Sequence, residues 1–174
     1  VNILSGMDSY MLEEEIESLC CDSRKAAPGS VFVCIKGAVS DGHNYAESAY
    51  GKGCRIFVAE HELSLPDDAE VFTVSDSRKA LALLSAEFFG NPADELYVIG
   101  ITGTKGKTTT ALTIYNILNA CGKKCGYIGS NGIDFGSFHY ETANTTPESF
   151  DVHQYMREMR LAGVEYLAIE VSSQ

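Results

Sequence analysis

A glycine-rich segment with two lysines and four threonines offers the clearest chemistry in the chain. It reads Gly103-Thr104-Lys105-Gly106-Lys107-Thr108-Thr109-Thr110. Glycines allow successive backbone N–H groups to point at a triphosphate, and the N-terminus of a following helix adds partial positive charge. Lys107 can then reach the β- and γ-phosphate oxygens, and the hydroxyl of Thr108 can bind Mg²⁺. The segment therefore predicts a loop that binds a nucleoside triphosphate.

The flanks of this loop are those that a phosphate-binding loop requires. Residues 96–101 form a continuous apolar run, which is typical of a strand buried on both faces of a parallel sheet. Apolar residues then recur at helical spacing from Ala111 to Cys121, and Gly122 offers the left-handed residue that ends a helix. The spacing Gly-x-x-Gly-Lys-Thr is shorter than the general pattern, which would place glycine where this chain has Ile101. An ordinary glycine-rich turn is the alternative, and both flanks argue against it.

Short strands alternate with helices on both sides of the loop, which indicates an α/β fold with mostly parallel sheets. We predict strands at 31–35, 55–59, 70–74, 125–128 and 164–171, a hairpin at 132–140, and helices at 44–52, 76–88 and about 146–161. Leu81, Leu84 and Phe88 share one face of the second helix, and Val152, Met156 and Met159 share one face of the last. The polar segment 91–95 contains a proline and marks our candidate domain boundary, which gives domains 1–93 and 94–174.

Composition limits the classes of partner. The chain has 174 residues, 45% hydrophobic content and a net charge of −11, which argues against nucleic acid. Residues 1–94 carry 7 Lys/Arg against 16 Asp/Glu, and residues 95–174 carry 6 against 8. An anionic ligand must therefore be held by a few individually positioned cations, N–H groups and Mg²⁺ instead of by a generally positive surface.

The chain has no membrane-length apolar run and no basic-then-apolar leader, so we expect a soluble, cytoplasmic protein with no membrane partner. We also expect a monomer.

The six cysteines form no Cys-x-x-Cys pair. Cys34, Cys121 and Cys125 lie within apolar patterns. We therefore expect buried reduced thiols in preference to zinc ligands or disulfides.

Two further segments admit both a functional and a structural interpretation. Glu170 ends an apolar strand, where a carboxylate can bind Mg²⁺ at the carboxyl edge of a nucleotide-binding sheet, or can simply face solvent. In Asn144-Thr145-Thr146-Pro147-Glu148, Thr146 with Pro147 suits a helix N-cap, and Thr145 with Glu148 suits a capping box. A helix start of this kind can also bind an anionic substrate, and the spacing does not distinguish the two roles.

Several short motifs that are weak alone form an ordered set. They are Asp22-Ser23-Arg24, Lys36-Gly37, Asp41-Gly42-His43, the loop 100–110, Asn144-Thr145-Thr146-Pro147 and Glu170-Val171-Ser172-Ser173. In this order they resemble the Mur ligases, most closely the members that add the third residue of the peptidoglycan precursor. The likeness covers most of the chain.

The resemblance implies a protein of three domains. Residues 1–93 would be the UDP-precursor-binding domain, residues 94–174 the first part of the central ATP-binding domain, and the C-terminal domain would be absent. The family uses ATP to convert a substrate carboxylate into an acyl phosphate, which the amine of an amino acid attacks to form an amide. The implied activity is addition of an amino acid, here a diamino acid, to UDP-MurNAc-L-Ala-D-Glu, and we expect this fragment to be inactive alone.

The resemblance also assigns residue roles. Lys107 would be catalytic, Gly103, Thr104, Lys105, Gly106, Lys107, Thr108 and Thr109 would bind ATP, and Thr108 and Glu170 would bind Mg²⁺. Ser23, Arg24 and His43 would lie near the UDP moiety. Asn144, Thr145, Thr146 and Ser172 would contact the muramoyl peptide.

Two positions depart from the family pattern. The family usually has asparagine where this chain has Lys105, and histidine where this chain has Gln174. A divergent paralogue with another carboxylate substrate is therefore one alternative, and a non-catalytic nucleotide-binding module is another.

Overall fold

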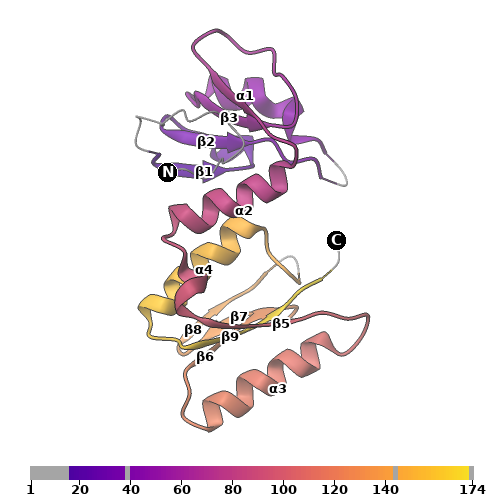
Figure 1. Cartoon of the computed structure of the whole chain (residues 1–174), viewed down its shortest axis with the longest axis vertical. Helices are drawn as coiled ribbons and strands as arrows, with labels where there is room; N and C mark the ends of the chain where they lie inside the picture. The colour runs from indigo at the N-terminus through magenta and orange to yellow at the C-terminus, as the bar shows by residue number, and fades with distance from the viewer. Residues whose placement is uncertain (1–15, 38–39, 143–144, 173–174) are drawn as a thin grey trace. The chain divides into compact units, whose positions relative to one another are not determined.

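The computed structural model describes residues 16–37, 40–142 and 145–172. The chain divides into two compact units, 1–87 and 88–174 (Figure 1). Among the described residues, no helix combines the length and apolar character needed to cross a membrane.

The first unit is built on a four-stranded parallel sheet whose strands follow one another in chain order. The strands are β1 (Ser18–Cys20), β2 (Ser30–Val33), β3 (Ile56–Ala59) and β4 (Glu70–Thr73). The helical elements are η1 (Ser23–Lys25), η2 (Gly42–Tyr45), α1 (Ala46–Gly51) and α2 (Ser77–Phe88). Figure 1 shows α1 and α2 on opposite sides of this sheet.

Every residue of β2 and β3 is buried, as expected for central strands covered on both faces. Phe32 and Phe57 are neighbours in the register and pack edge to face, with ring centroids 6.1 Å apart. Asp76 caps α2 by accepting a hydrogen bond of 2.9 Å from the N–H of Lys79. The predicted inward positions Leu81 and Leu84 are confirmed, because both are buried.

The second unit holds a five-stranded sheet in the order β5–β9–β6–β7–β8, parallel across the first three strands and antiparallel across the last three. The strands are β5 (Tyr97–Ile101), β6 (Cys125–Gly129), β7 (Gly132–Phe135), β8 (Phe138–Tyr140) and β9 (Tyr166–Glu170). The helical elements are η3 (Pro92–Glu95), α3 (Lys107–Ala120) and α4 (Ser149–Leu161). The predicted α/β fold and the hairpin at 132–140 are confirmed.

The helices α3 and α4 cover opposite faces of this sheet (Figure 1). Alternation along β9 explains the arrangement: Ala168 packs in the cluster with Ala111 of α3, whereas Leu167 packs in the cluster with Met159 of α4. Gly126 lets α4 approach closely, because a β-carbon there would lie 2.8 Å from the sulfur of Met159. The three predicted inward residues of α4 are confirmed, since Val152, Met156 and Met159 are buried.

We expect Met159→Ala to destabilise the second unit by about 2–5 kcal/mol, because it removes a side chain with no exposed surface and leaves a cavity. Leu161→Ala is the matched control on the same helix, since that side chain is 71% exposed. Urea denaturation followed by circular dichroism measures both variants. Equal losses of stability in the two variants would contradict the assigned core.

Three expectations about the second unit are wrong in detail. Strand 96–101 forms, but it is not buried on both faces: Tyr97 is 69% exposed, because β5 is at an edge of the sheet in the described residues. The last helix begins at Ser149 with Glu148 at its N-cap position, so the predicted cap at Thr146 does not form. Cys121 is exposed because it follows the last turn of α3, whereas Cys34 and Cys125 are buried as expected.

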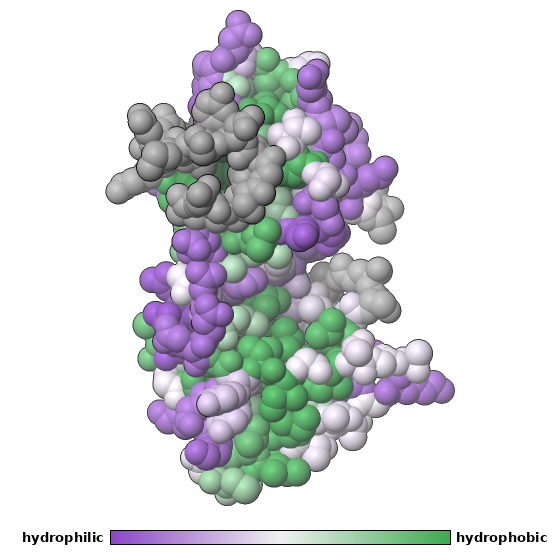
Figure 2. Space-filling model, viewed as in Figure 1, coloured by the Kyte–Doolittle hydropathy of each residue, from purple (hydrophilic) through white to green (hydrophobic). Residues whose placement is uncertain are grey.

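The surfaces of the two units differ in hydropathy on the face that Figure 2 shows. Figure 2 shows hydrophilic side chains over much of the first unit and a broad apolar area over the second, on the face in view. All six cysteines lie within the described residues and are free thiols. Burial raises the pKa of the Cys34 thiol to about 12, so this thiol is unreactive at neutral pH.

Candidate active site

The phosphate-loop segment lies between β5 and α3, as its spacing predicted. Gly103 and Gly106 have φ angles of 143° and 80°, which side chains other than glycine rarely adopt. Gly106 is the N-cap of α3, so the helix begins at Lys107, and its first N–H groups lack partners within the helix. The ammonium of Lys107 donates a hydrogen bond of 2.8 Å to the carbonyl of Gly103, which holds the cation over the loop. Thr104, Lys105 and Thr109 are exposed on the same segment.

The carboxylate of Glu170 meets this loop from the end of β9. Its Oε2 accepts a hydrogen bond of 2.9 Å from the hydroxyl of Thr108. Its Oε1 accepts hydrogen bonds of 2.6 Å from the hydroxyl of Tyr127 and 3.0 Å from the N–H of Ser130. Glu170 has no exposed surface, so the solvent-facing interpretation of this residue is wrong.

Burial by itself would raise the pKa of Glu170, but the donors from Tyr127, Ser130 and Thr108 and the nearby charge of Lys107 bring the pKa below its usual value. Glu170 is therefore ionised at neutral pH. One buried carboxylate beside a threonine hydroxyl suits Mg²⁺, which proteins usually bind through one or two carboxylates together with substrate phosphates and water. Among the described residues no cluster of three or more His, Cys, Asp or Glu side chains could hold a metal by itself, so the phosphates would have to supply further ligands.

Hydroxyl groups gather beside the same end of β9. Thr146 donates a hydrogen bond of 2.8 Å to the carbonyl of Glu170 and accepts one of 3.0 Å from the N–H of Ser172. The hydroxyls of Thr145 and Ser130 lie 2.9 Å apart. These contacts to the end of β9 and to the turn after β6 are made in place of the capping role of Thr145 and Thr146. They put both threonines and Ser172 near Glu170, which contacts the phosphate loop. Asn144 lies outside the described residues.

The other candidate substrate residues belong to the first unit. Ser23 and Arg24 line a cavity of about 390 Å³ together with Ile35, Gly42 and Tyr45. Asp22 binds Arg24 through both carboxylate oxygens and accepts the N–H of Arg24, which lowers the pKa of Asp22 to about 2. The guanidinium is held by this pair yet remains 86% exposed, so it can still meet an anionic ligand.

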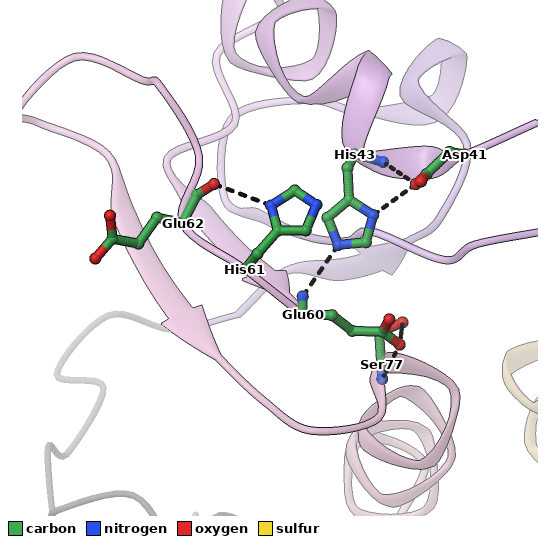
Figure 3. A network of polar contacts seen from close by, with 6 residues as sticks. All are labelled: Asp41, His43, Glu60, His61, Glu62 and Ser77. Atoms are coloured by element: carbon green, nitrogen blue, oxygen red, sulfur yellow. Dashed lines mark hydrogen bonds and ion pairs between the residues drawn. The ribbon is translucent and has the colours of Figure 1, made fainter.

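His43 lies in the polar network that Figure 3 shows. It lines a second cavity, of about 420 Å³, and is not among the residues that line the cavity of Ser23 and Arg24. Its Nδ1 lies 2.6 Å from Asp41 Oδ1, and its Nε2 accepts a hydrogen bond of 3.0 Å from the N–H of Glu60. Because Nε2 accepts, Nδ1 carries the proton that is shared with Asp41. Glu60 in turn accepts hydrogen bonds from the N–H and hydroxyl of Ser77, the first residue of α2. Both ring nitrogens of His43 therefore have protein partners, and any ligand contact would use the ring face or the backbone.

We expect His43→Leu to lower the melting temperature by about 5–10 °C, because Asp41 and the N–H of Glu60 both lose a partner. His61→Leu is the matched control. The exposed His61 ring stacks on His43 with the ring centroids 4.3 Å apart, and its Nδ1 lies 3.0 Å from the carbonyl oxygen of its neighbour Glu62 (Figure 3). Differential scanning calorimetry measures both. A larger loss in the His61 variant would contradict this role of His43.

Sequence reasoning missed several residues at these sites. Tyr127 and Ser130 contact Glu170 across two strands, and no local motif marks such a pair. Gly129 is required between them, because a β-carbon there would overlap the Glu170 carboxylate and the Tyr127 hydroxyl. Tyr45 is a 46% exposed aromatic in the cavity of Ser23 and Arg24, and its place two residues after Asp41-Gly42-His43 was the available signal.

Comparison with known proteins identifies the class of protein that carries such a loop and carboxylate. Residues 15–89 match the family described as Mur ligase family, catalytic domain, and residues 101–174 match the Mur ligase middle domain. The chain belongs to the Mur ligase family, and the resemblance noted in its motifs is confirmed.

Two individual relatives within this family carry the same name. The chain is 40% identical over 176 residues to the UDP-N-acetylmuramoyl-L-alanyl-D-glutamate–2,6-diaminopimelate ligase of Clostridium perfringens (strain 13 / Type A), covering 99% of this chain and 36% of the relative. It is 47% identical over 159 residues to the ligase of the same name from Geobacillus kaustophilus (strain HTA426), covering 91% of this chain and 32% of the relative. The chain thus spans about a third of the length of these relatives.

Solved structures agree on the fold. A structure of a UDP-N-acetylmuramoyl-L-alanyl-D-glutamate–2,6-diaminopimelate ligase matches with a TM-score of 0.74 at 23% identity, over 89% of this chain and 31% of that one. The MurF ligase of Thermotoga maritima in complex with ADP matches with a TM-score of 0.57 at 25% identity, over 92% of this chain and 33% of that one.

Proposed function

We propose that this chain forms the UDP-precursor-binding domain and the first part of the ATP-binding domain of an amide ligase, divided near residues 93 and 94. The complete protein would use ATP to add 2,6-diaminopimelate to UDP-MurNAc-L-Ala-D-Glu in the cytoplasm, as a monomer. The choice of these substrates is supported by the relatives, which are named UDP-N-acetylmuramoyl-L-alanyl-D-glutamate–2,6-diaminopimelate ligases. The observation that carries the proposal is the phosphate loop with Lys107 over it and Glu170 joined to Thr108.

The reaction makes two demands on charge. Transfer of the γ-phosphoryl group to a carboxylate, and then attack of the amine on the acyl phosphate, both concentrate negative charge on oxygen. Lys107 would move from the carbonyl of Gly103 to the β- and γ-phosphate oxygens and stabilise that charge there. The loop N–H groups, fixed by the φ angles of Gly103 and Gly106, would orient the same phosphates.

Thr108 and Glu170 would hold Mg²⁺, which when bound neutralises charge on the phosphate oxygens. The hydroxyl of Thr108 already donates to Glu170 Oε2, so its lone pairs stay free for a cation. The hydroxyls of Thr145, Thr146 and Ser172 would hold the muramoyl peptide beside these phosphates.

In the first unit, the guanidinium of Arg24 would bind a diphosphate oxygen, and Ser23 would contribute a hydroxyl in the same cavity. Tyr45 would offer a face on which the uracil base can stack. The role of His43 in this domain would be to fix the turn 41–45 that lines the cavity, through Asp41 and Glu60.

The test supplies the complete protein with ATP, Mg²⁺, UDP-MurNAc-L-Ala-D-Glu and a panel of amino acids, and identifies products by mass spectrometry. We expect one amide product, with 2,6-diaminopimelate, and one ADP released per product. ATP bound without consumption would favour a non-catalytic module. Consumption only with another carboxylate substrate would favour a divergent paralogue.

A further inference from the structure

We propose that Tyr127 is a positioning residue of the metal site: with the N–H of Ser130, its hydroxyl holds one oxygen of Glu170 so that the other faces the phosphate loop. The inference rests on the proposed Mg²⁺ site of Thr108 and Glu170. It adds to that site a residue that touches neither the phosphates nor the metal.

The two oxygens of the carboxylate have different partners. Oε1 accepts from Tyr127 at 2.6 Å and from Ser130 N at 3.0 Å, and both donors come from the end of β6 and the turn after it. Oε2 accepts only one contact among the described residues, from Thr108 at 2.9 Å. A carboxylate oxygen has two lone-pair sites, so Oε1 is filled and Oε2 keeps one site for a cation or its water.

Because Tyr127 and Glu170 are buried, the loss of either partner of their hydrogen bond is costly. Tyr127 is 1% exposed and Glu170 has no exposed surface, so water cannot take the place of a missing donor. The N–H of Asn131 donates to the Tyr127 hydroxyl at 3.4 Å, which leaves the hydroxyl proton directed at Glu170. Gly129 provides the space, because a β-carbon would overlap both the hydroxyl and the carboxylate. The turn that follows β6 therefore has room for the hydrogen bond between Tyr127 and Glu170 only because residue 129 is glycine.

Without the Tyr127 hydroxyl, the carboxylate can rotate and share Oε2 between Ser130 and Thr108. Partners that orient a metal-binding residue typically contribute about 10–100-fold to metal affinity. Tyr127→Phe removes one oxygen and keeps the ring that packs against α3.

Tyr115 supplies a matched control. It lies in the same cluster, its ring centroid is 6.2 Å from that of Tyr127, and its hydroxyl donates a hydrogen bond of 2.7 Å to Asp134. Tyr115→Phe therefore removes a tyrosine–carboxylate hydrogen bond of nearly the same length that does not involve Glu170.

The experiment measures binding of a non-hydrolysable ATP analogue to the complete protein by calorimetry, across a Mg²⁺ titration and in EDTA. We expect Tyr127→Phe to raise the Mg²⁺ concentration for half-maximal tightening by about tenfold or more, with affinity in EDTA unchanged. The Mg²⁺ dependence of Tyr115→Phe should match that of the wild type within about twofold, while its melting temperature falls about as much as that of Tyr127→Phe.

The remaining outcomes distinguish the positioning role of Tyr127 from the proposed metal site. Unchanged Mg²⁺ dependence in Tyr127→Phe, with the wild type Mg²⁺-dependent, overturns the positioning role and leaves the proposed function intact. Equal weakening with and without Mg²⁺ overturns it too, because that is a merely structural effect. A wild type that ignores Mg²⁺ overturns the metal site and this inference together. If Tyr127→Phe does not fold, Ser130→Pro removes the other donor to Oε1 and Ser130→Ala keeps it, and only the proline variant should shift the Mg²⁺ dependence.

Discussion

Lys107→Ala in the complete protein is expected to lower kcat/KM for ligation by at least about a thousandfold, or about 4 kcal/mol of transition-state stabilisation. The lysine is the first residue of α3, and its ammonium already lies 2.8 Å from the loop carbonyl of Gly103. The other lysine of the loop, Lys105, is exposed, and no hydrogen bond to a loop carbonyl is seen for it in the described part of the chain. Loss of the ammonium therefore leaves the transferred phosphoryl charge to the loop N–H groups and Mg²⁺.

Lys105→Ala is the comparison variant for Lys107, since it removes the same charge from the same loop. We expect its effect to stay below about tenfold and to fall mainly on KM for ATP, because an exposed flexible lysine contributes through weak, screened attraction. Steady-state kinetics with both variants, together with their melting temperatures, separates chemistry from folding. A Lys107→Ala protein that ligates at the wild-type rate would contradict the assigned role.

Glu170→Gln is expected to lower kcat/KM by about a hundredfold or more and to raise the Mg²⁺ requirement. The substitution keeps the size of the side chain but removes the buried charge that meets Thr108. It also places an amide where both Tyr127 and Ser130 donate to a carboxylate oxygen. Activity measured against Mg²⁺ concentration tests this expectation.

Glu165→Gln is the control for Glu170, because Glu165 is an exposed carboxylate just before β9 and pairs with Lys123 at 3.8 Å. Such a surface pair contributes little, so activity and Mg²⁺ dependence should both be unchanged. If the two glutamine variants show the same Mg²⁺ dependence, Glu170 is not a metal ligand.

The phosphate loop could be predicted from sequence because all its determinants are local. Glycines, lysine and threonine lie within eight residues, and the strand and helix that fix them are their immediate neighbours. Glu170 was identified as a candidate for the same reason, as a carboxylate at a strand end. Its partner Thr108 is 62 positions away, and the hydrogen bond between them depends on the pairing of β5 with β9.

Other features depend on tertiary structure and were missed or wrong. The contact of Tyr127 with Glu170 requires the register of β6 on β9. The local signal for a helix start at Thr146 was overridden, because its hydroxyl bonds to the backbone at the end of β9. Tyr97 is exposed because β5 lies at the edge of the sheet in the described residues. The order of the strands in the sheet sets this edge position, and the sequence of β5 does not reveal it.

The central claim is that ATP activates a carboxylate by phosphorylating it, and oxygen transfer tests this most directly. The complete protein would be given UDP-MurNAc-L-Ala-D-Glu labelled with ¹⁸O in the glutamate carboxylates, with ATP, Mg²⁺ and 2,6-diaminopimelate. Breakdown of an acyl phosphate by the amine expels phosphate that carries one oxygen from the carboxylate. We predict one ¹⁸O atom in the inorganic phosphate for each amide formed, and unlabelled phosphate accompanying amide formation would contradict the account.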